Sequence, residues 1–488
     1  YRDIDILNTP PTLGYGRVNE SLTAFQYNAV NGIRSNKKQF TLKHNTIPIY
    51  EKGFDPEDTS KLNRSTGVFT IPNHFFSENE ELIYTPLSTF AGVGATALQM
   101  SGGSDLPTTV FVKKIDNSSF KLATSSGGSA VTFTSVGAGN SHRLTMAKRT
   151  EKSVLVIDGR DPIGSPLQCG ELVPSNEEMK RLCPDVPDID DLFQTPDEAI
   201  SMTCDQMHII TPSGKALKYS FEGLMLNRVA HDENLVAIAK QAGAEYLVGK
   251  RVVRAEGNTV FLRDGNTLTA KVIVDAAGHK GPIRREYWDE KSVTIPVKFC
   301  LMDGHFGDAV ELHFGSVAPG GYAWMFPKAG GANIGLGIQR SFAKGKTLNQ
   351  YADEFISNYD GETTFNGAGG LPMSGTIKSF VKGNFMLVGD SAGMVLPSNG
   401  AGITIAMIGG RIAGQIIHEH LENNIPLTNY ETEWKKQMGK VMKNSKRSFK
   451  IGSLMFRLPN WMLNLLFNRL TKGIVWRAVT CKRMFFIL

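Results

Sequence analysis

The stretch GDSAGMVLPSNGAGITIAMIGGRIAG, residues 389–414, joins a short apolar strand to a long apolar helix through a glycine-rich loop. The preceding residues 384–388 are typical of a buried strand, and residues 403–421 carry apolar residues at helical spacing without a proline. The glycines let the backbone approach a ligand closely, and the first N–H groups of the helix have no partner within it. Because a helix N-terminus carries about half a positive charge, this loop favours phosphate or an anionic ring. The alternative is an ordinary strand–loop–helix connection.

Four other stretches have patterns that suit a nucleotide-binding α/β fold. Residues 152–158 form an apolar run that ends in Asp158, where a dinucleotide fold places the acid that binds ribose hydroxyls, and IGSPLQCGE follows at 163–171. Residues 272–286, VIVDAAGHKGPIRRE, are another apolar strand that ends in a small-residue loop. The other two stretches are Leu226-Asn227-Arg228, which runs into a segment expected to be helical over 235–253, and GGYAWMFPKAGGANIGLGI at 320–338.

Together these stretches resemble FAD-dependent reductases and hydroxylases of the p-hydroxybenzoate hydroxylase (PHBH) type, and specifically the geranylgeranyl reductase family. The resemblance implies an α/β fold: a PHBH-like, Rossmann-type FAD-binding core at 145–425 with an antiparallel substrate sheet interleaved at about 195–225 and 290–380. It implies FAD as the cofactor, and saturation of C=C bonds in geranylgeranyl (prenyl) chains of an isoprenoid or archaeal-type ether lipid as the reaction. Relatives often have Ala-Asp-Gly where this chain has Asp275-Ala276-Ala277, which puts a role for Asp275 in doubt.

The resemblance also implies roles for individual residues. The residues implied to bind FAD are Asp158, Arg228, Gly389, Asp390, Pro397, Gly400, Gly402 and Ile403. The loop over the flavin carries the candidate catalytic residues Cys169, Gly170 and Glu171. The implied wall of the lipid cavity is Tyr322, Trp324, Phe326 and Pro327. Because the cofactor supplies the difficult chemistry, the protein has to add position, a dry apolar cavity and the dipole of the 402–421 helix.

Two of these assignments compete with simpler interpretations. The alternation of Tyr322, Trp324 and Phe326 suits core packing of a strand as well as a substrate wall.

Cys169 either helps to deliver a proton or is a thiol that only shapes the cavity. The chain has five cysteines, without a C-x-x-C pair or a ligand-like cluster with histidine. This pattern indicates reduced thiols, and neither a disulfide framework nor a metal site.

The N-terminal third has a different composition, rich in Ser, Thr, Asn and Gly. Short β-prone runs such as TTVFVKKI and AVTFTSV, separated by turn residues, predict a small all-β domain at 61–144 after an extended arm at 1–60. This region loosely resembles the repeated β-modules of tailed-phage structural proteins.

An intact strand and G-x-G-x-x-G turn, which would cradle the FAD pyrophosphate, is missing ahead of residue 153. The best candidate, Gly137-Ala138-Gly139, has His142 at the third glycine position, where a side chain obstructs close helix–strand contact. Gly92-Val93-Gly94 lies too far upstream. Either residues 133–150 form a degenerate dinucleotide loop, or an unrelated β-domain is joined to a reductase truncated near Ala147. We favour the second interpretation.

The C-terminal segment 426–488 is predicted to be a basic amphipathic helical tail. From Trp434 onward the chain carries thirteen Lys or Arg and no Asp or Glu, although its overall net charge is only +6. Charged residues interrupt every apolar run before it reaches the ~20 residues of a membrane span. The pattern suits helices on an anionic membrane surface, which we favour for a lipid substrate, or helices that cover the core with basic residues in solvent. With no recognition motif, nucleic acid is not an expected partner.

The sequence therefore supports three functional hypotheses. The first is the prenyl reductase, with a prenylated lipid substrate, an external electron donor such as NAD(P)H or ferredoxin, and a cytoplasmic location with peripheral membrane association. The second is an FAD-dependent aromatic monooxygenase. The third is a phage structural protein that carries a non-functional reductase-like fragment.

Overall fold

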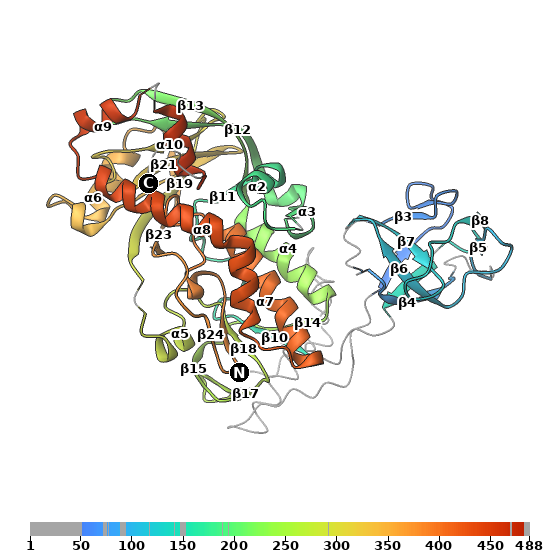
Figure 1. Cartoon of the computed structure of the whole chain (residues 1–488). Coiled ribbons are helices and arrows are strands. Elements are labelled where there is room, and N and C mark those ends of the chain that lie inside the picture. The colour runs from blue at the N-terminus through green and yellow to red at the C-terminus, as the bar shows by residue number, and fades with distance from the viewer. Residues whose placement is uncertain are drawn as a thin grey trace, which may run out of the picture.

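The computed structural model describes residues 51–71, 76, 78–87, 94–116, 118–140, 142–146, 153–187, 189–193, 195–290, 292–468 and 471–482. Residues 1–50 of the arm expected at 1–60, the Gly92-Val93 turn, the truncation point near Ala147 and the last residues MFFIL lie outside this set. The part of that arm at Glu51–Phe54 is a strand of the N-terminal sheet. The described residues form an all-β N-terminal part and a larger α/β core (Figure 1). Within them, no helix is both long and apolar enough to cross a membrane.

The N-terminal part consists of two antiparallel sheets around an aromatic core. The larger sheet has, in spatial order, β1 (Glu51–Phe54), β9 (His142–Met146), β4 (Glu81–Thr85), β6 (Thr109–Lys114), β7 (Ser119–Ala123), β3 (Val68–Thr70) and β2 (Leu62–Asn63). β5 (Gln99–Met100) pairs with β8 (Phe133–Ser135). Alternate residues of β4 and β6 are buried, and Phe69 stacks on Phe120 with ring centroids 5.2 Å apart. The predicted period-2 pattern thus builds the core of this part.

The candidate dinucleotide turn at 137–142 belongs to the N-terminal part. His142 opens β9 and is fully buried, with Nδ1 2.7 Å from the hydroxyl of Tyr84. Burial lowers the pKa of His142, which favours the neutral ring. Because β9 pairs with β1 and β4, a strand follows Gly139 where a dinucleotide fold requires a helix. The interpretation of residues 133–150 as a degenerate dinucleotide loop is therefore wrong for its described residues.

The α/β core contains two small parallel sheets. β10 (Val154–Ile157) pairs with β14 (Ala244–Leu247), and β18 (Ile273–Asp275) pairs with β25 (Phe385–Leu387), which also binds β24 (Val381–Lys382). α4 (Arg228–Gln241) leads to β14. The expected helix over 235–253 is wrong beyond Gln241, because Gly243 adopts a φ of 90° and the next residues join the sheet.

Shorter elements surround these sheets. β15 (Val252–Glu256), β16 (Thr259–Leu262) and β17 (Thr267–Thr269) form a meander, next to α5 (Pro282–Tyr287). The short helices are α2 (Asn176–Leu182), α3 (Ile189–Leu192) and the 3₁₀ turns η1 (Asp197–Ala199), η2 (Arg340–Phe342) and η3 (Gly389–Ala392).

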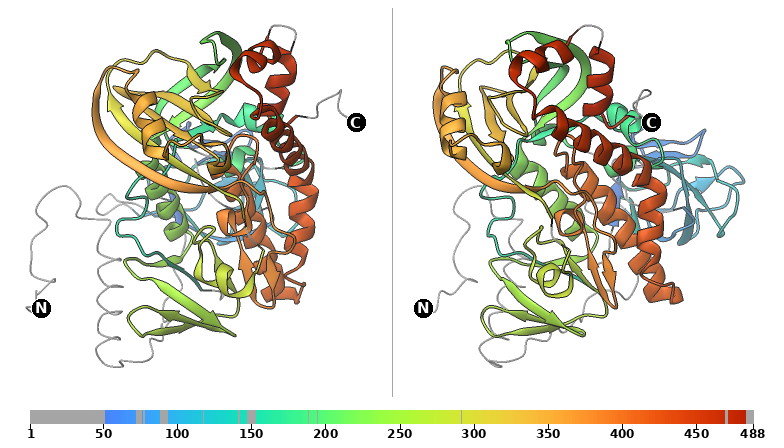
Figure 2. Two further views of the ribbon diagram at one scale, coloured as in Figure 1. Left: turned by 90° about the vertical axis from the view of Figure 1, so that its left-hand side faces the viewer. Right: turned by 60° about the vertical axis from the view of Figure 1, so that its left-hand side comes forward.

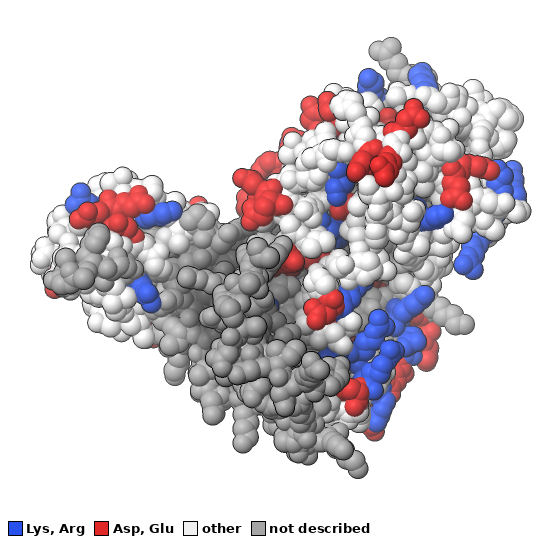
Figure 3. Space-filling view, turned by 180° about the vertical axis from the view of Figure 1, so that it is seen from behind, with Lys and Arg blue, Asp and Glu red and all other residues white. Residues whose placement is uncertain are grey.

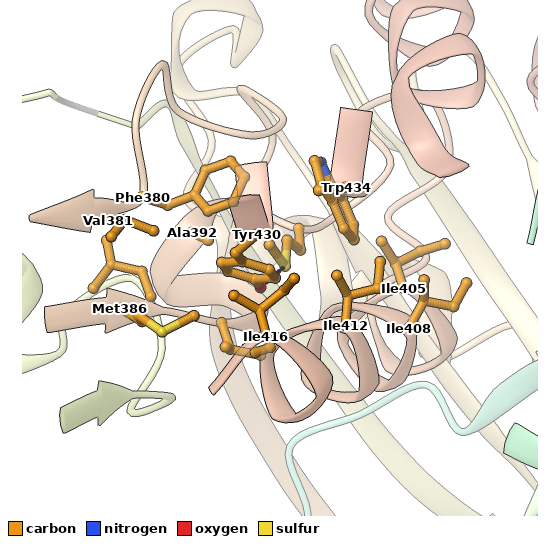
Figure 4. Close-up of a cluster of buried hydrophobic side chains, with 14 of the residues drawn as sticks. Phe380, Val381, Met386, Ala392, Ile405, Ile408, Ile412, Ile416, Tyr430 and Trp434 are labelled. Atoms are coloured by element: carbon orange, nitrogen blue, oxygen red, sulfur yellow. Dashed lines mark hydrogen bonds between the residues drawn. The ribbon is translucent and has the colours of Figure 1, made fainter. Parts of the chain in front are cut away.

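Two long helices, α7 (Ile403–Asn423) and α8 (Asn429–Met455), pack beside the parallel strands. Ile405, Ile408, Ile412 and Ile416 recur along one side of α7, as the helical period requires. They meet Met386 of β25 and the aromatic residues Phe380, Tyr430 and Trp434 (Figure 4). Each fully buried side chain of this kind contributes about 1.5–3 kcal/mol.

The apolar face of α8 is part of this core. Tyr430, Trp434, Met438 and Met442 are all buried, whereas the charged side chains of Lys436 and Lys440 are mostly exposed. Of the two interpretations of the C-terminal segment, α8 therefore follows the one in which it covers the core with basic residues in solvent. A membrane surface would have to contact other residues.

The substrate sheet is an eight-stranded, mostly antiparallel sheet. Its spatial order is β11 (Leu172–Pro174), β13 (Ala216–Leu226), β12 (Ile200–Ile210), β20 (Val310–His313), β21 (Tyr322–Lys328), β22 (Gly331–Gly337), β19 (Thr294–Asp303) and β23 (Glu362–Pro372). α6 (Leu348–Ile356) packs on β19 and β22. The C-terminal helices α9 (Asn460–Leu466) and α10 (Lys472–Val479) lie at the opposite end of α8 from α7, next to this sheet (Figure 2).

Candidate flavin and substrate site

A cavity of about 3320 Å³ lies between the parallel strands, the substrate sheet and the start of α7. Ligand pockets for drug-sized molecules measure roughly 300–1,000 Å³, so this one has room for more than one group. Every residue with an implied role lines it except Pro327, which is buried elsewhere on β21. The structure thus brings the other implied residues, which span positions 158 to 403 of the sequence, to one cavity. Their roles in binding and catalysis remain predictions.

The segment Cys169–Glu171 forms one wall of the cavity. Glu171 is only 2% exposed and has a φ of +69°, which is uncommon for a residue with a side chain. Its carboxylate accepts from Lys328 Nζ at 2.7 Å and from Asn333 Nδ2 at 3.1 Å. A Cβ on Gly170 would lie 3.3 Å from the ring of Phe326, so glycine permits this close approach.

Asn333 connects this segment to the aromatic wall. Its Nδ2 also donates to the carbonyl of Cys169 at 2.9 Å, and its Oδ1 accepts from Trp324 Nε1 at 2.9 Å. Sequence reasoning missed Asn333 and Lys328. The signal that could have found Asn333 is its place as a lone polar residue in the small, apolar run GANIGLG, where burial demands hydrogen bonds.

The aromatic wall is made by the cavity side of β21. Trp324 and Phe326 stack with centroids 6.0 Å apart, and Tyr322 donates its hydroxyl to the carbonyl of Asn399 at 2.6 Å. Burial raises the pKa of Tyr322 to about 12, so the phenol stays neutral. From α10, Trp476 reaches the same cavity and stacks on Tyr219 at 4.6 Å. Each aromatic thus serves both core and cavity, and the two interpretations of this strand do not exclude each other.

Arg228 begins α4 and points at the thiol of Cys169. Its Nη1 lies 3.3 Å from Cys169 Sγ, and its Nη2 donates to both oxygens of Asp232 at 2.8 and 2.9 Å. Burial raises the pKa of Cys169 despite the neighbouring cation, so the thiol keeps its proton. The Nε of Arg228 is buried without a hydrogen-bond partner in the described part of the chain. A cofactor oxygen would satisfy this donor.

The loop that precedes α7 forms the other side of the cavity. Gly389 and Gly400 have positive φ angles of 63° and 77°, and a Cβ on Gly400 would lie 2.7 Å from a methyl group of Leu371. Gly402 caps α7 without a side chain, which leaves the first N–H groups of the helix open to the cavity. Burial raises the pKa of Asp390 to about 6. The geometry suits an electron-rich ring beside the helix start.

Asp275, whose role the sequence left in doubt, organises this region. Its carboxylate accepts from the N–H groups of Ala277 at 2.8 Å and Arg284 at 2.9 Å, and from the hydroxyl of Ser391 at 3.0 Å. It therefore ties the end of β18 to α5 and η3.

These observations fit only part of an FAD molecule. On the side expected to hold the flavin ring, the cavity has the glycine loop, the start of α7 and the buried Nε of Arg228, which has no hydrogen-bond partner among the described residues. On the side expected to hold the ribose, Asp158 follows β10, and one of its carboxylate oxygens accepts from the N–H of Arg160 at 2.8 Å. In the described residues, however, no glycine-rich turn opens a helix beside β10 and β18 to receive the pyrophosphate. The ring and ribose sites fit FAD, and the pyrophosphate site does not.

A basic patch borders the same cavity. Seen from behind, Lys and Arg side chains gather at the lower right, on the side where Figure 1 shows β15, β17 and α5 (Figure 3). Arg251, Arg263 and Lys271, which flank the strands of the β15–β17 meander, are exposed and line the cavity. These cations are spread along the meander and form no charged run in the sequence, unlike those of the C-terminal segment. The patch attracts phosphate in general, without the directed N–H groups of a helix start.

The fold is that of the FAD-dependent oxidoreductases of the PHBH class. Residues 295–368 match the geranylgeranyl reductase catalytic domain. Digeranylgeranylglycerophospholipid reductase 1 of Methanococcoides burtonii is 31% identical over 342 residues, which cover 64% of this chain and 81% of the relative. Digeranylgeranylglycerophospholipid reductase 2 of Methanopyrus kandleri is 30% identical over 376 residues, which cover 70% of this chain and 91% of the relative. The chain belongs to the geranylgeranyl reductase family.

Solved structures agree with this assignment. A geranylgeranyl bacteriochlorophyll reductase-like protein from Thermoplasma acidophilum is 25% identical, with a TM-score of 0.57 over 64% of this chain and 84% of that chain. The halogenase PltM, 14% identical with a TM-score of 0.50 over 67% and 78% of the chains, shares the fold alone.

Proposed function

We propose that this protein uses FAD to saturate C=C bonds in the geranylgeranyl chains of an archaeal-type ether lipid. The observation that carries the proposal is one cavity that joins a flavin-ring loop to an aromatic wall, in a chain similar to digeranylgeranylglycerophospholipid reductases. The electrons come from an external donor such as NAD(P)H or ferredoxin. When bound, the flavin supplies the electron pair for the alkene.

The chain's own residues position the lipid and hold a proton. Trp324 and Phe326 provide a rigid, dry surface for a prenyl chain, and Asn333 fixes both this wall and the Cys169 backbone. Cys169 keeps its proton beside the wall because burial raises the pKa of the thiol. We assign to Cys169 the delivery of the proton to the second alkene carbon, with Glu171 and Lys328 holding the segment in place.

Anaerobic turnover tests the proposal. Full-length protein with added FAD, a chemical reductant and a digeranylgeranyl phospholipid should yield a lipid that gains two hydrogens per saturated bond, measured by mass spectrometry. Cys169→Ser, which keeps a proton donor of similar size, should retain more activity than Cys169→Ala. A strict need for oxygen would instead show a monooxygenase. Equal rates for the two Cys169 variants would remove the proton-delivery role while leaving the reductase assignment intact.

We further propose a peripheral contact with an anionic membrane through the end of α8, α9 and α10. Trp461 and Leu465 are 63% and 65% exposed, and Leu454, Leu466 and Ile474 are also exposed. Arg457 lies in the turn between α8 and α9, and Lys472 and Arg477 lie on α10. An apolar surface flanked by cations favours an anionic lipid interface. The location of Trp476 at the cavity would bring lipid substrate close to the site.

A further inference from the structure

A straight line of cations runs along the outer side of α8, which crosses the outside of the α/β core (Figure 1). Its members are exposed and follow one another at steps of four, three, four and three residues: Lys436, Lys440, Lys443, Arg447 and Lys450. Residues at this spacing lie on one side of a helix, so at 1.5 Å per residue the line is about 21 Å long. This set, the α8 stripe, therefore presents five positive charges in one row.

Most of the α8 stripe has no partner of opposite charge. Lys436 Nζ lies 3.4 Å from the carboxylate of Glu433, and Lys440 Nζ lies 3.0 Å from that of Asp185. The other three members have no ion pair in the described part of the chain. Like charges three or four residues apart repel one another and destabilise a helix. An anionic surface placed along the stripe would remove this repulsion.

The opposite side of α8 holds the loop that precedes α7. Ser445 is fully buried, and its hydroxyl oxygen accepts from the N–H of Ser398 at 3.0 Å. Ser398 lines the cavity on the side expected to hold the flavin ring. Each residue of a helix is turned by about 100°, so the whole stripe lies within about 40° of the direction opposite Ser445. Only α8 itself, about 10–12 Å thick, therefore separates the stripe from this loop.

The composition of this side of α8 favours a protein over a membrane as its partner. A helix that lies in a membrane interface buries an apolar face in lipid. The apolar face of α8 packs in the core instead, and no apolar side chain lies on the stripe side between Lys436 and Lys450. The exposed apolar residues of the proposed membrane contact begin only at Leu454. Exposed charges of one sign suit a fast encounter with a protein of the opposite sign.

We propose that the α8 stripe is the docking surface for a small acidic one-electron carrier protein. A carrier bound there would stand one helix diameter from the loop on the ring side of the cavity. Encounters of this kind use small interfaces, and charge complementarity speeds their association. Each saturated C=C bond takes one electron from each of two reduced carriers, which leave oxidised, and two protons that come in the end from water. The docking stands on the charges of α8, and only the identification of the partner as an electron donor rests on the proposed function.

The probe is a fluorescently labelled, oxidised plant-type ferredoxin of acidic composition, added to the full-length chain without FAD or lipid. Anisotropy should show saturable binding at about 20 mM salt and at least about tenfold weaker binding at about 300 mM, because salt screens exposed charges. Labelled cytochrome c, a basic carrier, should not bind. The turnover assay described above uses a chemical reductant, so failure of docking is distinct from failure of the proposed reaction.

Two triple variants, each of which reverses three positive charges, separate the stripe from the basic patch beside β15–β17. They are Lys443→Glu/Arg447→Glu/Lys450→Glu on α8 and the matched control Arg251→Glu/Arg263→Glu/Lys271→Glu on the patch. The α8 variant should bind ferredoxin at least about tenfold more weakly than the parent chain, and the control less than about threefold more weakly. The two variants have the same net charge, so a difference between them reports the place of binding.

Circular dichroism melts check that both variants fold. If the α8 charge reversal does not fold, Lys443→Gln/Arg447→Gln/Lys450→Gln replaces it and should weaken binding about threefold or more. Equal ferredoxin affinity of the parent and the α8 variant overturns the proposal. A loss of affinity in the patch control as large as in the α8 variant also overturns it, as does the absence of saturable binding to the parent.

Flotation with vesicles of phosphatidylserine and phosphatidylcholine tests the membrane as the alternative partner. We expect the α8 variant and the parent to float to within about twofold of each other, because the proposed membrane contact lies beyond the stripe. If the α8 variant loses vesicle binding and keeps its affinity for ferredoxin, the stripe is a membrane surface and the proposal is wrong.

Discussion

Lys328→Met is expected to destabilise the α/β core by about 3–5 kcal/mol. The substitution leaves the buried carboxylate of Glu171 without the ammonium group 2.7 Å away. Breaking a buried pair in this way costs about that amount, since the remaining charge has no compensating partner. Asn333 still donates to Glu171 at 3.1 Å, so we expect the lower end of the range. The matched double variant Lys328→Met/Glu171→Gln removes the charge and should recover most of the loss.

Urea unfolding followed by tryptophan fluorescence is the assay. All five tryptophans lie between Trp288 and Trp476, so the signal reports the core and not the N-terminal part. Glu171→Gln alone should cost less than Lys328→Met, because the Lys328 side chain is more exposed than that of Glu171. A cost below about 1 kcal/mol for Lys328→Met, or a double variant no more stable than that single variant, would refute the reasoning.

Asp390→Asn should stabilise the ligand-free chain by about 3 kcal/mol at pH 7.5 and by little at pH 4. Burial raises the pKa of this acid to about 6, so the native state loses stability as pH rises from about 4 through 6. If Asp390→Asn shifts the melting temperature equally at pH 7.5 and at pH 4, this reasoning is contradicted. Trp324→Ala should slow turnover of a long prenyl lipid and leave bound flavin intact, with a folding cost of about 3–5 kcal/mol to be checked by thermal melts. Loss of flavin with unchanged turnover per remaining flavin would reverse the assignment. Trp461→Ser/Leu465→Ser should reduce flotation of the full-length chain with anionic liposomes. The loss should be clearest at high salt, because salt screens the attraction of about 1 kcal/mol that each unchanged nearby cation contributes and leaves the apolar contact to hold the chain. Equal recovery of variant and parent argues against a membrane contact there.

Local sequence patterns predicted the elements that hold the site, because each pattern has a physical cause that lies within a few neighbouring residues. The apolar run that ends in Asp158 is β10, and the glycine loop before Ile403 opens α7. The alternation at Tyr322, Trp324 and Phe326 is β21. Hydrophobic period and glycine placement are short-range information, so a single sequence shows them directly.

Contacts between distant segments could not be predicted in this way. Lys328 and Asn333 reach Glu171 only through the register of β21 and β22, which no local pattern specifies. Burial of the apolar face of α8 depends on α7 as its partner, so its sequence suited a membrane surface equally well. The end of α4 could have been predicted, since Gly243 is a typical helix stop.

The last helix has a consequence for how the protein matures on the ribosome. The carbonyl of Val479 accepts from Asn399 at 2.9 Å, and Cys481 Sγ lies 3.1 Å from the hydroxyl of Ser398, so the end of the chain fastens the loop before α7. Synthesis proceeds at about 5–20 residues per second and the N-terminal part folds first. The loop therefore acquires these partners only after the chain has emerged as far as Cys481, and nascent chains stalled upstream of Val479 would present an unfinished cavity to chaperones.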